Sequence, residues 1–205
     1  MKEENSMRVI TLGESGVGKT SLIRRYIHNI FDENNLATIG LNFALKQVQL
    51  KNGKTINIRL IDTAGQEKYR SLVKSYFKNA DAVLFIFSLD TKDSFDCMIN
   101  WINLFNENCK VKRCIPRYLI GNKADQDRKV SNDVIDEFIS KNKYKYYETS
   151  AKDNTGIDEL FQELAEDLYK ILVETGGNNK PQNTEKISKF KKKQKSDCIC
   201  AIRQD

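Results

Sequence analysis

Apolar and polar residues follow one another along this chain in the two periods that distinguish strands from helices. Strand-like runs, alternating or continuously apolar, cover residues 7–12, 43–50, 55–61, 82–89, 117–122 and 143–150. Helical spacing of apolar residues is clearest over residues 21–30, 94–108, 134–141 and 157–173. The patterns together predict six strands and five helices that alternate through most of the chain.

The order of these elements predicts an α/β fold. The runs 43–50 and 55–61 are joined by Asn52-Gly53, a dipeptide that favours a tight hairpin, so these strands should pair antiparallel. The continuously apolar runs 82–89 and 117–122 are typical of a parallel sheet that is covered on both faces. We therefore expect a six-stranded, mostly parallel sheet with one antiparallel edge strand and five helices on both faces.

Length and composition indicate one soluble domain with a tail. Hydrophobic residues make up 40% of the 205 residues and charged residues 30%. The longest apolar run, 82–87, is far shorter than the roughly 20 residues of a membrane span, and the polar start lacks a signal peptide's apolar region. We expect an N-terminal extension at 1–6, a folded domain at 7–173 and a flexible polybasic tail at 174–205.

Charge and cysteine usage exclude several classes of protein. The net charge is +6, and residues 174–205 hold eight basic and four acidic side chains, so the folded part lacks the basic surface of a nucleic-acid-binding protein. Five cysteines without CxxC spacing argue against a disulfide framework or a structural zinc site. We interpret Cys97, Cys109 and Cys114 as core or surface thiols in a reducing compartment.

The segment GESGVGKT at 13–20 fits the phosphate-binding pattern GxxxxGK[ST] and lies between a predicted strand and a predicted helix. Its glycines let backbone N–H groups curl around phosphate oxygens. Lys19 would neutralise the β and γ charges, and Thr20 would offer its hydroxyl to Mg²⁺. The nucleotide-binding residues here would be Ser15, Gly16, Val17, Gly18, Lys19, Thr20 and Ser21.

The segment DTAGQE at 62–67 directly follows the strand at 55–61. Asp62 could hold Mg²⁺ beside the phosphates, although an Asp at this place is also a common turn or N-cap residue. Gly65 would let a backbone N–H approach the γ-phosphate. The amide of Gln66 could orient an attacking water, so Gln66 is the principal catalytic candidate.

The segment Asn122-Lys123-Ala124-Asp125 follows the strand at 117–122. Guanine presents two donors on one edge, N1–H and its exocyclic amine, which the Asp125 carboxylate could accept together; adenine lacks this pair. Lys123 would lie along the base and Asn122 would tie this loop to 13–20. Alone these are ordinary loop residues, but behind the two earlier segments they predict guanine binding.

These segments, followed by ETSAK at 148–152, closely resemble the Ras superfamily of small GTPases over about residues 7–173. Within that superfamily, TIGLNF at 38–43 and YFKNA at 76–80 are similar to the Rab branch. The resemblance implies a P-loop GTPase fold. It also implies a switch that binds guanine nucleotide with Mg²⁺, hydrolyses GTP to GDP and phosphate, and regulates vesicle-mediated transport.

The resemblance further assigns roles to individual residues. Thr38 would reach Mg²⁺ and the γ-phosphate, and Phe31 would lie against the guanine. Catalysis would rest on Gln66, Lys19 and Thr38, and the metal ligands would be Thr20, Thr38 and Asp62. The base site would add the backbone N–H of Ala151 with its neighbours Ser150 and Lys152. Effectors would contact a patch of Phe43, Ile61 and Tyr76, in which Ile61 replaces the usual Rab tryptophan.

The resemblance also implies partners and a location. No arginine finger is supplied in cis, so intrinsic hydrolysis should run on the order of 10⁻⁴ s⁻¹ and need a GTPase-activating protein. An exchange factor and effectors of the GTP-bound state are implied too. We expect a cytoplasmic monomer that acts on the cytosolic face of endomembranes or vesicles and binds no nucleic acid.

The tail resembles a Rab ending. Cys198 and Cys200 follow a polybasic stretch and are lipidation candidates, although five more residues follow them. Prenylation there would imply a GDP-dissociation inhibitor or an escort protein. The alternatives are a tail that binds a membrane surface through its lysines alone and a soluble tail with two unmodified thiols.

Two other functions fit parts of the sequence. A nucleotide-locked scaffold without useful turnover would have no need of Gln66 as a water-positioning group. A P-loop kinase that uses adenine nucleotides would bind ATP and would tolerate Asp125→Asn.

Overall fold

The computed structural model describes residues 6–33, 38, 40–65, 70–109 and 114–175. The elements in chain order are β1 (Ser6–Leu12), α1 (Lys19–His28), β2 (Leu41–Gln49), β3 (Thr55–Thr63), α2 (Arg70–Phe77), β4 (Ala82–Ser88), α3 (Lys92–Asp96), α4 (Met98–Asn108), β5 (Arg117–Asn122), α5 (Asn132–Asn142), β6 (Lys145–Thr149) and α6 (Ile157–Glu174). Strands and helices alternate as the apolar pattern predicts.

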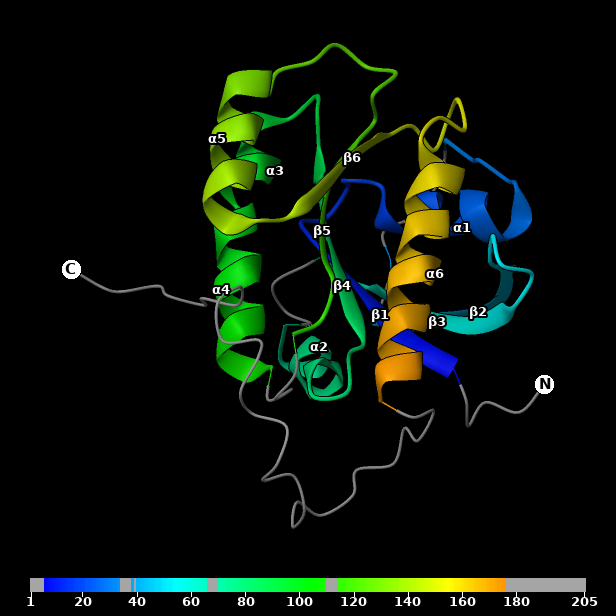
Figure 1. Ribbon diagram of the computed structural model, residues 1–205. Coiled ribbons are helices and arrows are strands. Elements are labelled where there is room, and N and C mark those ends of the chain that lie inside the picture. The colour runs from blue at the N-terminus through cyan, green and yellow to red at the C-terminus, as the bar shows by residue number, and fades with distance from the viewer. Residues whose placement is uncertain (1–5, 34–37, 39, 66–69, 110–113, 176–205) are drawn as a thin grey trace.

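The strands form one six-stranded sheet in the order β2-β3-β1-β4-β5-β6 (Figure 1). Strand β2 pairs antiparallel with β3 at the edge, and the other neighbours are parallel. The turn between β2 and β3 contains Asn52 and Gly53, and Gly53 has a φ of 80° that glycine adopts without strain. The predicted sheet and its antiparallel edge strand are confirmed.

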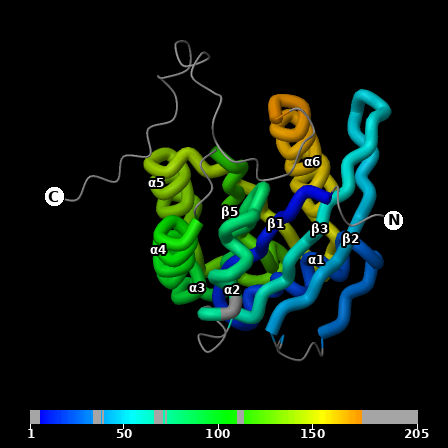
Figure 2. Tube along the Cα trace, turned by 90° about the horizontal axis from the view of Figure 1, so that it is seen from below, coloured from blue at the N-terminus to red at the C-terminus, as the bar shows by residue number. Residues whose placement is uncertain are grey.

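Helices cover both faces of the sheet, and the view from below shows the two helical layers (Figures 1 and 2). Helices α1 and α6 pack on one face, while α2, α4 and α5 pack on the other. Side chains alternate along each strand, so neighbours such as Val9 and Ile10 belong to different apolar layers. The two layers fix the register of the central strands.

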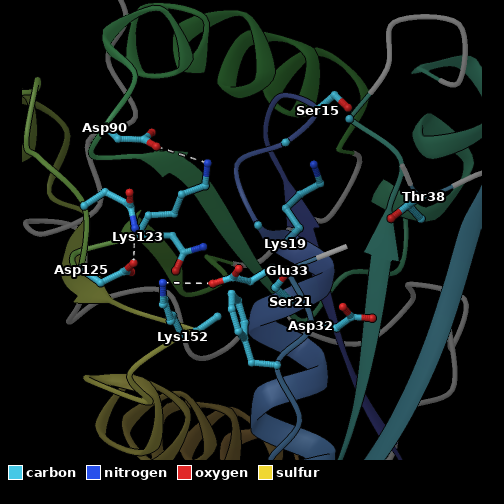
Figure 3. Close-up of a pocket in the computed structure, with 17 residues that line it drawn as sticks. Ser15, Lys19, Ser21, Asp32, Glu33, Thr38, Asp90, Lys123, Asp125 and Lys152 are labelled. Carbon is cyan, nitrogen blue, oxygen red and sulfur yellow. Dashed lines mark hydrogen bonds and ion pairs between the residues drawn. The ribbon is translucent and has the colours of Figure 1, made fainter. Parts of the chain in front are cut away.

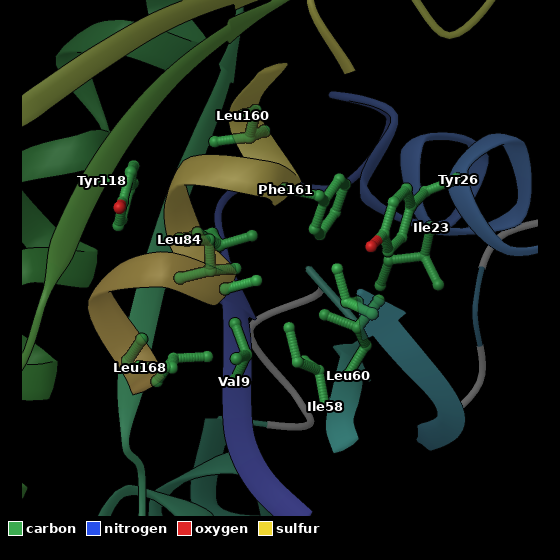
Figure 4. Close-up of a cluster of buried hydrophobic side chains, with 14 of the residues drawn as sticks. Val9, Ile23, Tyr26, Ile58, Leu60, Leu84, Tyr118, Leu160, Phe161 and Leu168 are labelled. Atoms are coloured by element: carbon green, nitrogen blue, oxygen red, sulfur yellow. The ribbon is translucent and has the colours of Figure 1, made fainter. Parts of the chain in front are cut away.

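The layer beneath α1 and α6 contains the closest aromatic pair of the core (Figure 4). Tyr26 of α1 stacks on Phe161 of α6 with ring centroids 3.7 Å apart. Val9, Leu60 and Leu84 from three adjacent strands complete the layer and are fully buried. Burying each such side chain stabilises the fold by about 1.5–3 kcal/mol, which anchors α1 and the loop that precedes it.

The helix predicted over 94–108 differs in detail. Helix α3 ends at Asp96 and α4 begins at Met98, with Cys97 between them in a helical conformation (φ −72°, ψ −13°). The Cys97 N–H donates to the Asp93 carbonyl at 2.9 Å, so helical hydrogen bonding continues across the junction. Counted as one interrupted helix, α3 and α4 bring the helices of the described ranges to the predicted five.

Two of the cysteines interpreted as thiols, Cys97 and Cys109, are free and partly buried, as predicted. Separately, the helices of the described residues include none that is both long and apolar enough to cross a bilayer.

Candidate functional site

A cavity of about 380 Å³ opens where the loops after β1, β3, β4 and β5 meet at one edge of the sheet (Figure 3). Carboxyl ends of parallel strands gather at such an edge, which is where α/β folds bind ligands. The predicted nucleotide-binding residues that line the cavity are Ser15, Gly16, Gly18, Lys19, Ser21, Phe31, Thr38, Gly65, Asn122, Lys123, Asp125, Ala151 and Lys152. Segments far apart in sequence therefore share one hollow.

Three further predicted residues, Val17, Thr20 and Ser150, do not line this cavity. The Val17 side chain is buried in the core beside α1, and the residue contributes its carbonyl to the site. The Thr20 hydroxyl bonds to Asp62, and the Ser150 hydroxyl bonds to Asp125. These residues can support the site through backbone atoms or through the side chains that they hold.

The loop at 13–20 wraps back on itself before α1 begins at Lys19. Gly18 caps the helix with a φ of 93°, which glycine adopts readily and other residues rarely do. A Cβ at Gly18 would lie 2.3 Å from Asn122 Nδ2, so the position is also too crowded for a side chain. The Asn122 amide donates to the Val17 carbonyl at 2.9 Å and holds this loop to β5.

Lys19 is buried at the centre of the loop. Its ammonium donates to the carbonyls of Gly13 at 2.9 Å and Glu14 at 2.7 Å. Burial lowers the pKa of Lys19 to about 8, against the opposing charges of Asp62 and Glu14. An anion in the cavity would favour the charged form, which suits a phosphate-binding lysine.

Three oxygens gather beside the start of α1. Thr20 Oγ1 donates to Asp62 Oδ2 at 2.7 Å and lies 2.5 Å from Thr38 Oγ1. Asp62 Oδ1 is buried without a hydrogen-bond partner, and burial raises the pKa of this carboxyl although Thr20 and Lys19 oppose the shift. Mg²⁺ prefers such oxygen ligands, so two hydroxyls and an orphaned carboxylate oxygen fit this ion.

No group of three His, Cys, Asp or Glu that could hold a metal occurs among the residues with described positions. The oxygens beside α1 do not form such a group, because only one of them is a carboxylate. An ion held there would complete its shell with phosphate oxygens and water, as Mg²⁺ commonly does.

Gly65 presses the end of β3 against the phosphate loop. A Cβ at this position would lie 2.4 Å from both the Glu14 carbonyl carbon and the Ser15 nitrogen, so only glycine allows this approach. The Gly65 backbone thereby reaches the edge of the cavity. Gln66, the next residue, lies outside the described residues, and its catalytic role stays a prediction.

Asn122 and Asp125 form the opposite end of the cavity. Asn122 is buried and accepts a hydrogen bond from the Thr149 hydroxyl at 3.1 Å. Asp125 accepts from the Ser150 hydroxyl at 2.7 Å and from the Gln126 amide at 2.5 Å. Burial alone would raise the pKa of Asp125, but these hydrogen bonds outweigh it and lower the pKa. The carboxylate is therefore charged at neutral pH and can accept from a ligand.

Comparison with known proteins identifies the family. A family model described as "Ras family" matches residues 8–170. The chain belongs to the Ras family. Ras-related protein Rab-13 of Bos taurus is 33% identical over 205 residues, covering 97% of this chain and 98% of the relative. Rab-11A of Dictyostelium discoideum is 35% identical over 179 residues, covering 86% and 82% respectively. Human Rab-30 is 35% identical over 160 residues, covering 77% of each.

These findings confirm the predicted small GTPase and its P-loop fold, with a likeness to Rab proteins. The enzyme class follows, because members of this family hydrolyse GTP. The match covers β1 through most of α6, which is the part of the chain that surrounds the cavity.

Four residues of the GTPase cavity escaped the sequence analysis: Asp32, Glu33, Asp90 and Gln126. Asp90 lies 3.4 Å from the Lys123 ammonium and also accepts from the Ser88 hydroxyl at 2.6 Å. Glu33 pairs with Lys152 at 3.0 Å. Asp90 could have been suspected, because it follows the end of β4, at the edge of the sheet where the motifs gather. It was missed because it belongs to none of the motifs.

Arg25 is a second missed support of the GTPase site. From α1 its guanidinium donates to the carbonyls of Ala151 at 2.7 Å and Lys152 at 3.0 Å. Its carbon Cζ also lies 5.9 Å from the centre of the Phe31 ring. This arginine therefore links two segments that the family resemblance assigns to the guanine base.

Trp101, the single tryptophan, also reaches the phosphate loop. It is 1% exposed, and its indole Nε1–H donates to Glu14 Oε1 at 2.8 Å. Helix α4 is thereby tied to residue 14 of the loop. This contact could not be predicted, because nothing in the helical pattern distinguishes a tryptophan that only packs from one that also donates a hydrogen bond.

The three residues of the predicted effector patch meet, but not equally. Phe43 is 45% exposed, and its ring centroid lies 5.6 Å from that of the half-buried Tyr76. Ile61 is only 1% exposed, because it pairs in register with Phe43 and packs in the core beside α2. The expectation that Ile61 adds contact surface therefore needs correction: it forms the floor beneath the two rings.

The lipidation candidates Cys198 and Cys200 lie outside the described residues, and their modification stays a prediction.

Proposed function

We propose that this Ras-family GTPase is a Rab-like switch that alternates between GTP and GDP and regulates vesicle-mediated transport. The observation that carries the proposal is that groups suited to phosphate, to Mg²⁺ and to guanine lie at one cavity. A buried lysine in a glycine-rich loop, a cluster of oxygens suited to Mg²⁺ and a charged Asp125 line or adjoin the same hollow. A guanosine triphosphate needs all three at once.

In this proposal different residues bind the phosphates, the guanine base and the metal ion. Residues Ser15 to Ser21 hold the phosphates, with Lys19 as the charge partner of the β and γ groups. Asp125 accepts the two donors of guanine, while Lys123 and Phe31 flank the base and the Ala151 N–H meets its oxygen. Mg²⁺, held by Thr20, Thr38 and Asp62, would neutralise phosphate charge. The support is that most of these residues line one cavity, while Thr20 bonds to Asp62 beside it.

Hydrolysis would follow from groups that the chain itself supplies. Gln66 would orient a water whose oxygen attacks the γ-phosphorus, while the bond to the β–γ bridging oxygen breaks and GDP leaves. Lys19 would stabilise the charge that collects on that leaving oxygen. Thr38 and the Gly65 N–H would touch the γ-phosphate and be released with it, which is the change that partners read.

Partners and location follow from the Rab likeness. We propose that an activating protein, an exchange factor and effectors of the GTP state act on residues 7–173. A monomer would work on the cytosolic face of endomembranes, and the tail at 174–205 would bind the membrane. Prenylation of Cys198 and Cys200 would add a GDP-dissociation inhibitor or an escort protein. The six lysines between positions 186 and 195, at roughly 1 kcal/mol each on an anionic leaflet, would assist the anchor.

The test is nucleotide specificity. Wild-type protein should bind GTP and GDP in preference to ATP, and Asp125→Asn should lose GTP affinity by at least about a hundredfold and gain xanthosine triphosphate binding. The asparagine presents a donor where guanine also presents one, whereas xanthine offers an acceptor. Asp127→Asn, an exposed carboxylate outside the cavity, serves as control and should change nothing. Retained GTP affinity in Asp125→Asn, or preference of the wild type for ATP, would refute the proposal.

A further inference from the structure

A second cavity, of about 330 Å³, lies on the sheet face beside the end of α2. Two arginines line it, Arg8 of β1 and Arg59 of β3, together with the rings of Phe43 and Tyr76 and the floor residue Ile61. We refer to it as the two-arginine cavity. None of these residues lines the nucleotide cavity, so the two hollows are separate surfaces of the molecule.

The sheet register places the two arginines side by side. Arg8 and Arg59 are direct partners in the parallel ladder of β1 and β3, so their side chains leave the same face of the sheet. The Arg59 guanidinium lies over the Phe43 ring at 4.6 Å from its centre, a cation–π contact. The Tyr76 ring centre lies 5.6 Å from the centre of the Phe43 ring. Two cations and two aromatic rings therefore surround one opening.

Within the part of the chain that the structure describes, no ion pair balances the positive charge of this cavity. None of the ion pairs found in the described ranges includes Arg8 or Arg59. The nearby Asp81 accepts the Arg8 backbone N–H at 2.7 Å, is 5% exposed and does not line the cavity. Adjacent like charges on one sheet face are destabilising, so an anionic group between them would be favoured.

We propose that the two-arginine cavity receives a carboxylate side chain, Asp or Glu, from a protein partner of this chain. The inference rests on the proposed function, because the cavity adjoins the exposed Phe43 of the predicted effector patch. A carboxylate matches the guanidinium fork in bidentate geometry. The methylenes of the acidic side chain would pack on Phe43 and Tyr76, where burial removes water from the ion pair.

The proposal commits to a protein partner because of the shape and neighbours of the cavity. The hollow is continuous with aromatic surface, and recognition surfaces of proteins combine buried aromatic anchors with arginine. Ile61 lies on its floor, where the resemblance predicts a larger tryptophan, so this chain leaves room for an incoming side chain. This cavity would select partners by their negative charge. A patch with tryptophan at position 61 would instead select them by the shape of their apolar surface.

The experiment uses the full chain loaded with a non-hydrolysable GTP analogue. Helical-hairpin proteins are selected from a display library, and those whose binding is abolished by Phe43→Ala are kept. Each acidic residue of a selected hairpin is then changed to its amide, and the affinities are measured for wild type, Arg59→Gln and Arg59→Lys. Lys78→Gln, an exposed cation outside the cavity, is the matched control.

We expect at least one carboxylate in each hairpin whose removal weakens binding by about tenfold. Arg59→Gln should weaken binding of the acidic hairpin by a similar factor, but should weaken binding of its amide version less than twofold. Arg59→Lys should retain part of the affinity for the acidic hairpin. Lys78→Gln should change the affinity for neither hairpin. The proposal would be overturned if Arg59→Gln reduced the affinities of the acidic and amide hairpins equally. It would also be overturned if no selected hairpin needed a carboxylate for binding, or if no hairpin that depends on Phe43 were recovered. Binding to anionic vesicles that is lost in Arg59→Gln would assign the cavity to membrane and also overturn it.

The same proteins separate this inference from the proposed function. Arg59 does not line the nucleotide cavity, so GTP hydrolysis by Arg59→Gln should equal that of the wild type. A wild type that binds the acidic hairpins without hydrolysing GTP would refute only the proposed function. A chain that hydrolyses GTP but shows no coupling between Arg59 and a carboxylate would refute only the inference.

Discussion

Replacing Asn122 with alanine tests the link that joins the phosphate end and the base end of the site. The Asn122 side chain is 1% exposed, donates to the Val17 carbonyl at 2.9 Å and accepts from the Thr149 hydroxyl at 3.1 Å. The Asn122 amide thereby joins β5 to the phosphate loop. Alanine removes both bonds and leaves two buried polar groups behind.

The size of the effect follows from these contacts. Each hydrogen bond contributes about 0.5–1.5 kcal/mol net, and each buried polar group left unpaired costs about 1–3 kcal/mol, partly relieved by water. We therefore expect Asn122→Ala to lower the free energy of unfolding by about 3 kcal/mol. Thr149→Val removes one bond while keeping the shape of the side chain, so it should cost about 1 kcal/mol. GDP should also dissociate at least about tenfold faster from Asn122→Ala, because the two loops no longer hold one another.

The assay is denaturant unfolding at fixed GDP and Mg²⁺ concentrations, since bound ligand adds to apparent stability, together with release of a fluorescent GDP. Asn142→Ala is a matched control, because the Asn142 amide makes a single exposed bond to the Phe138 carbonyl at 2.8 Å. The control should change stability by less than about 0.5 kcal/mol. An Asn122→Ala variant no less stable than the control, with unchanged GDP release, would refute the reasoning.

Two further predictions follow from close contacts. Gly65→Ala places a Cβ 2.4 Å from the Glu14 backbone, so it should displace the end of β3 and slow single-turnover GTP hydrolysis at least about tenfold; wild-type rates would contradict this. Asp167 accepts from Tyr118, Lys145 and Lys170, and these bonds outweigh burial and lower its pKa. Asp167→Asn should cost about 2 kcal/mol at pH 7, measured by unfolding. The difference should shrink as the pH falls below about 4, where the unfolded carboxyl takes up a proton, and should vanish below the lowered pKa of the folded carboxyl. A loss independent of pH would contradict the ionic account.

Much of the fold could be predicted because its cause is local. The Asn52-Gly53 turn and the alternation of apolar residues in 43–50 and 55–61 indicate a hairpin, and that hairpin is the antiparallel edge of the sheet. The break between α3 and α4 could not be predicted, because Cys97 keeps a helical conformation and only the hydrogen-bond register changes. Helix α2 also lacked a clear signal, since it is short and its burial depends on the sheet beneath it.

Much of the candidate site could also be predicted, because its motifs follow strand ends that meet at one edge. The residues that were missed act across long separations in sequence. Arg25 supports the Ala151 carbonyl from 126 residues away, and Trp101 donates to Glu14 from 87 residues away. Neither lies in a motif, and only packing brings them to the site. The burial of Ile61 was missed for the same reason, because α2 and Phe43 cover it only in the folded chain.

The central claim is that this chain hydrolyses GTP with Gln66 as the group that positions water. The most direct test is single-turnover hydrolysis of GTP with Mg²⁺ by the wild type and by Gln66→Leu, with nucleotide affinity measured in both. The account predicts slow turnover by the wild type, on the order of 10⁻⁴ s⁻¹, and at least about tenfold slower turnover by Gln66→Leu with GTP still tightly bound. Equal rates in the two proteins, or no hydrolysis by a wild type that binds GTP tightly, would contradict it.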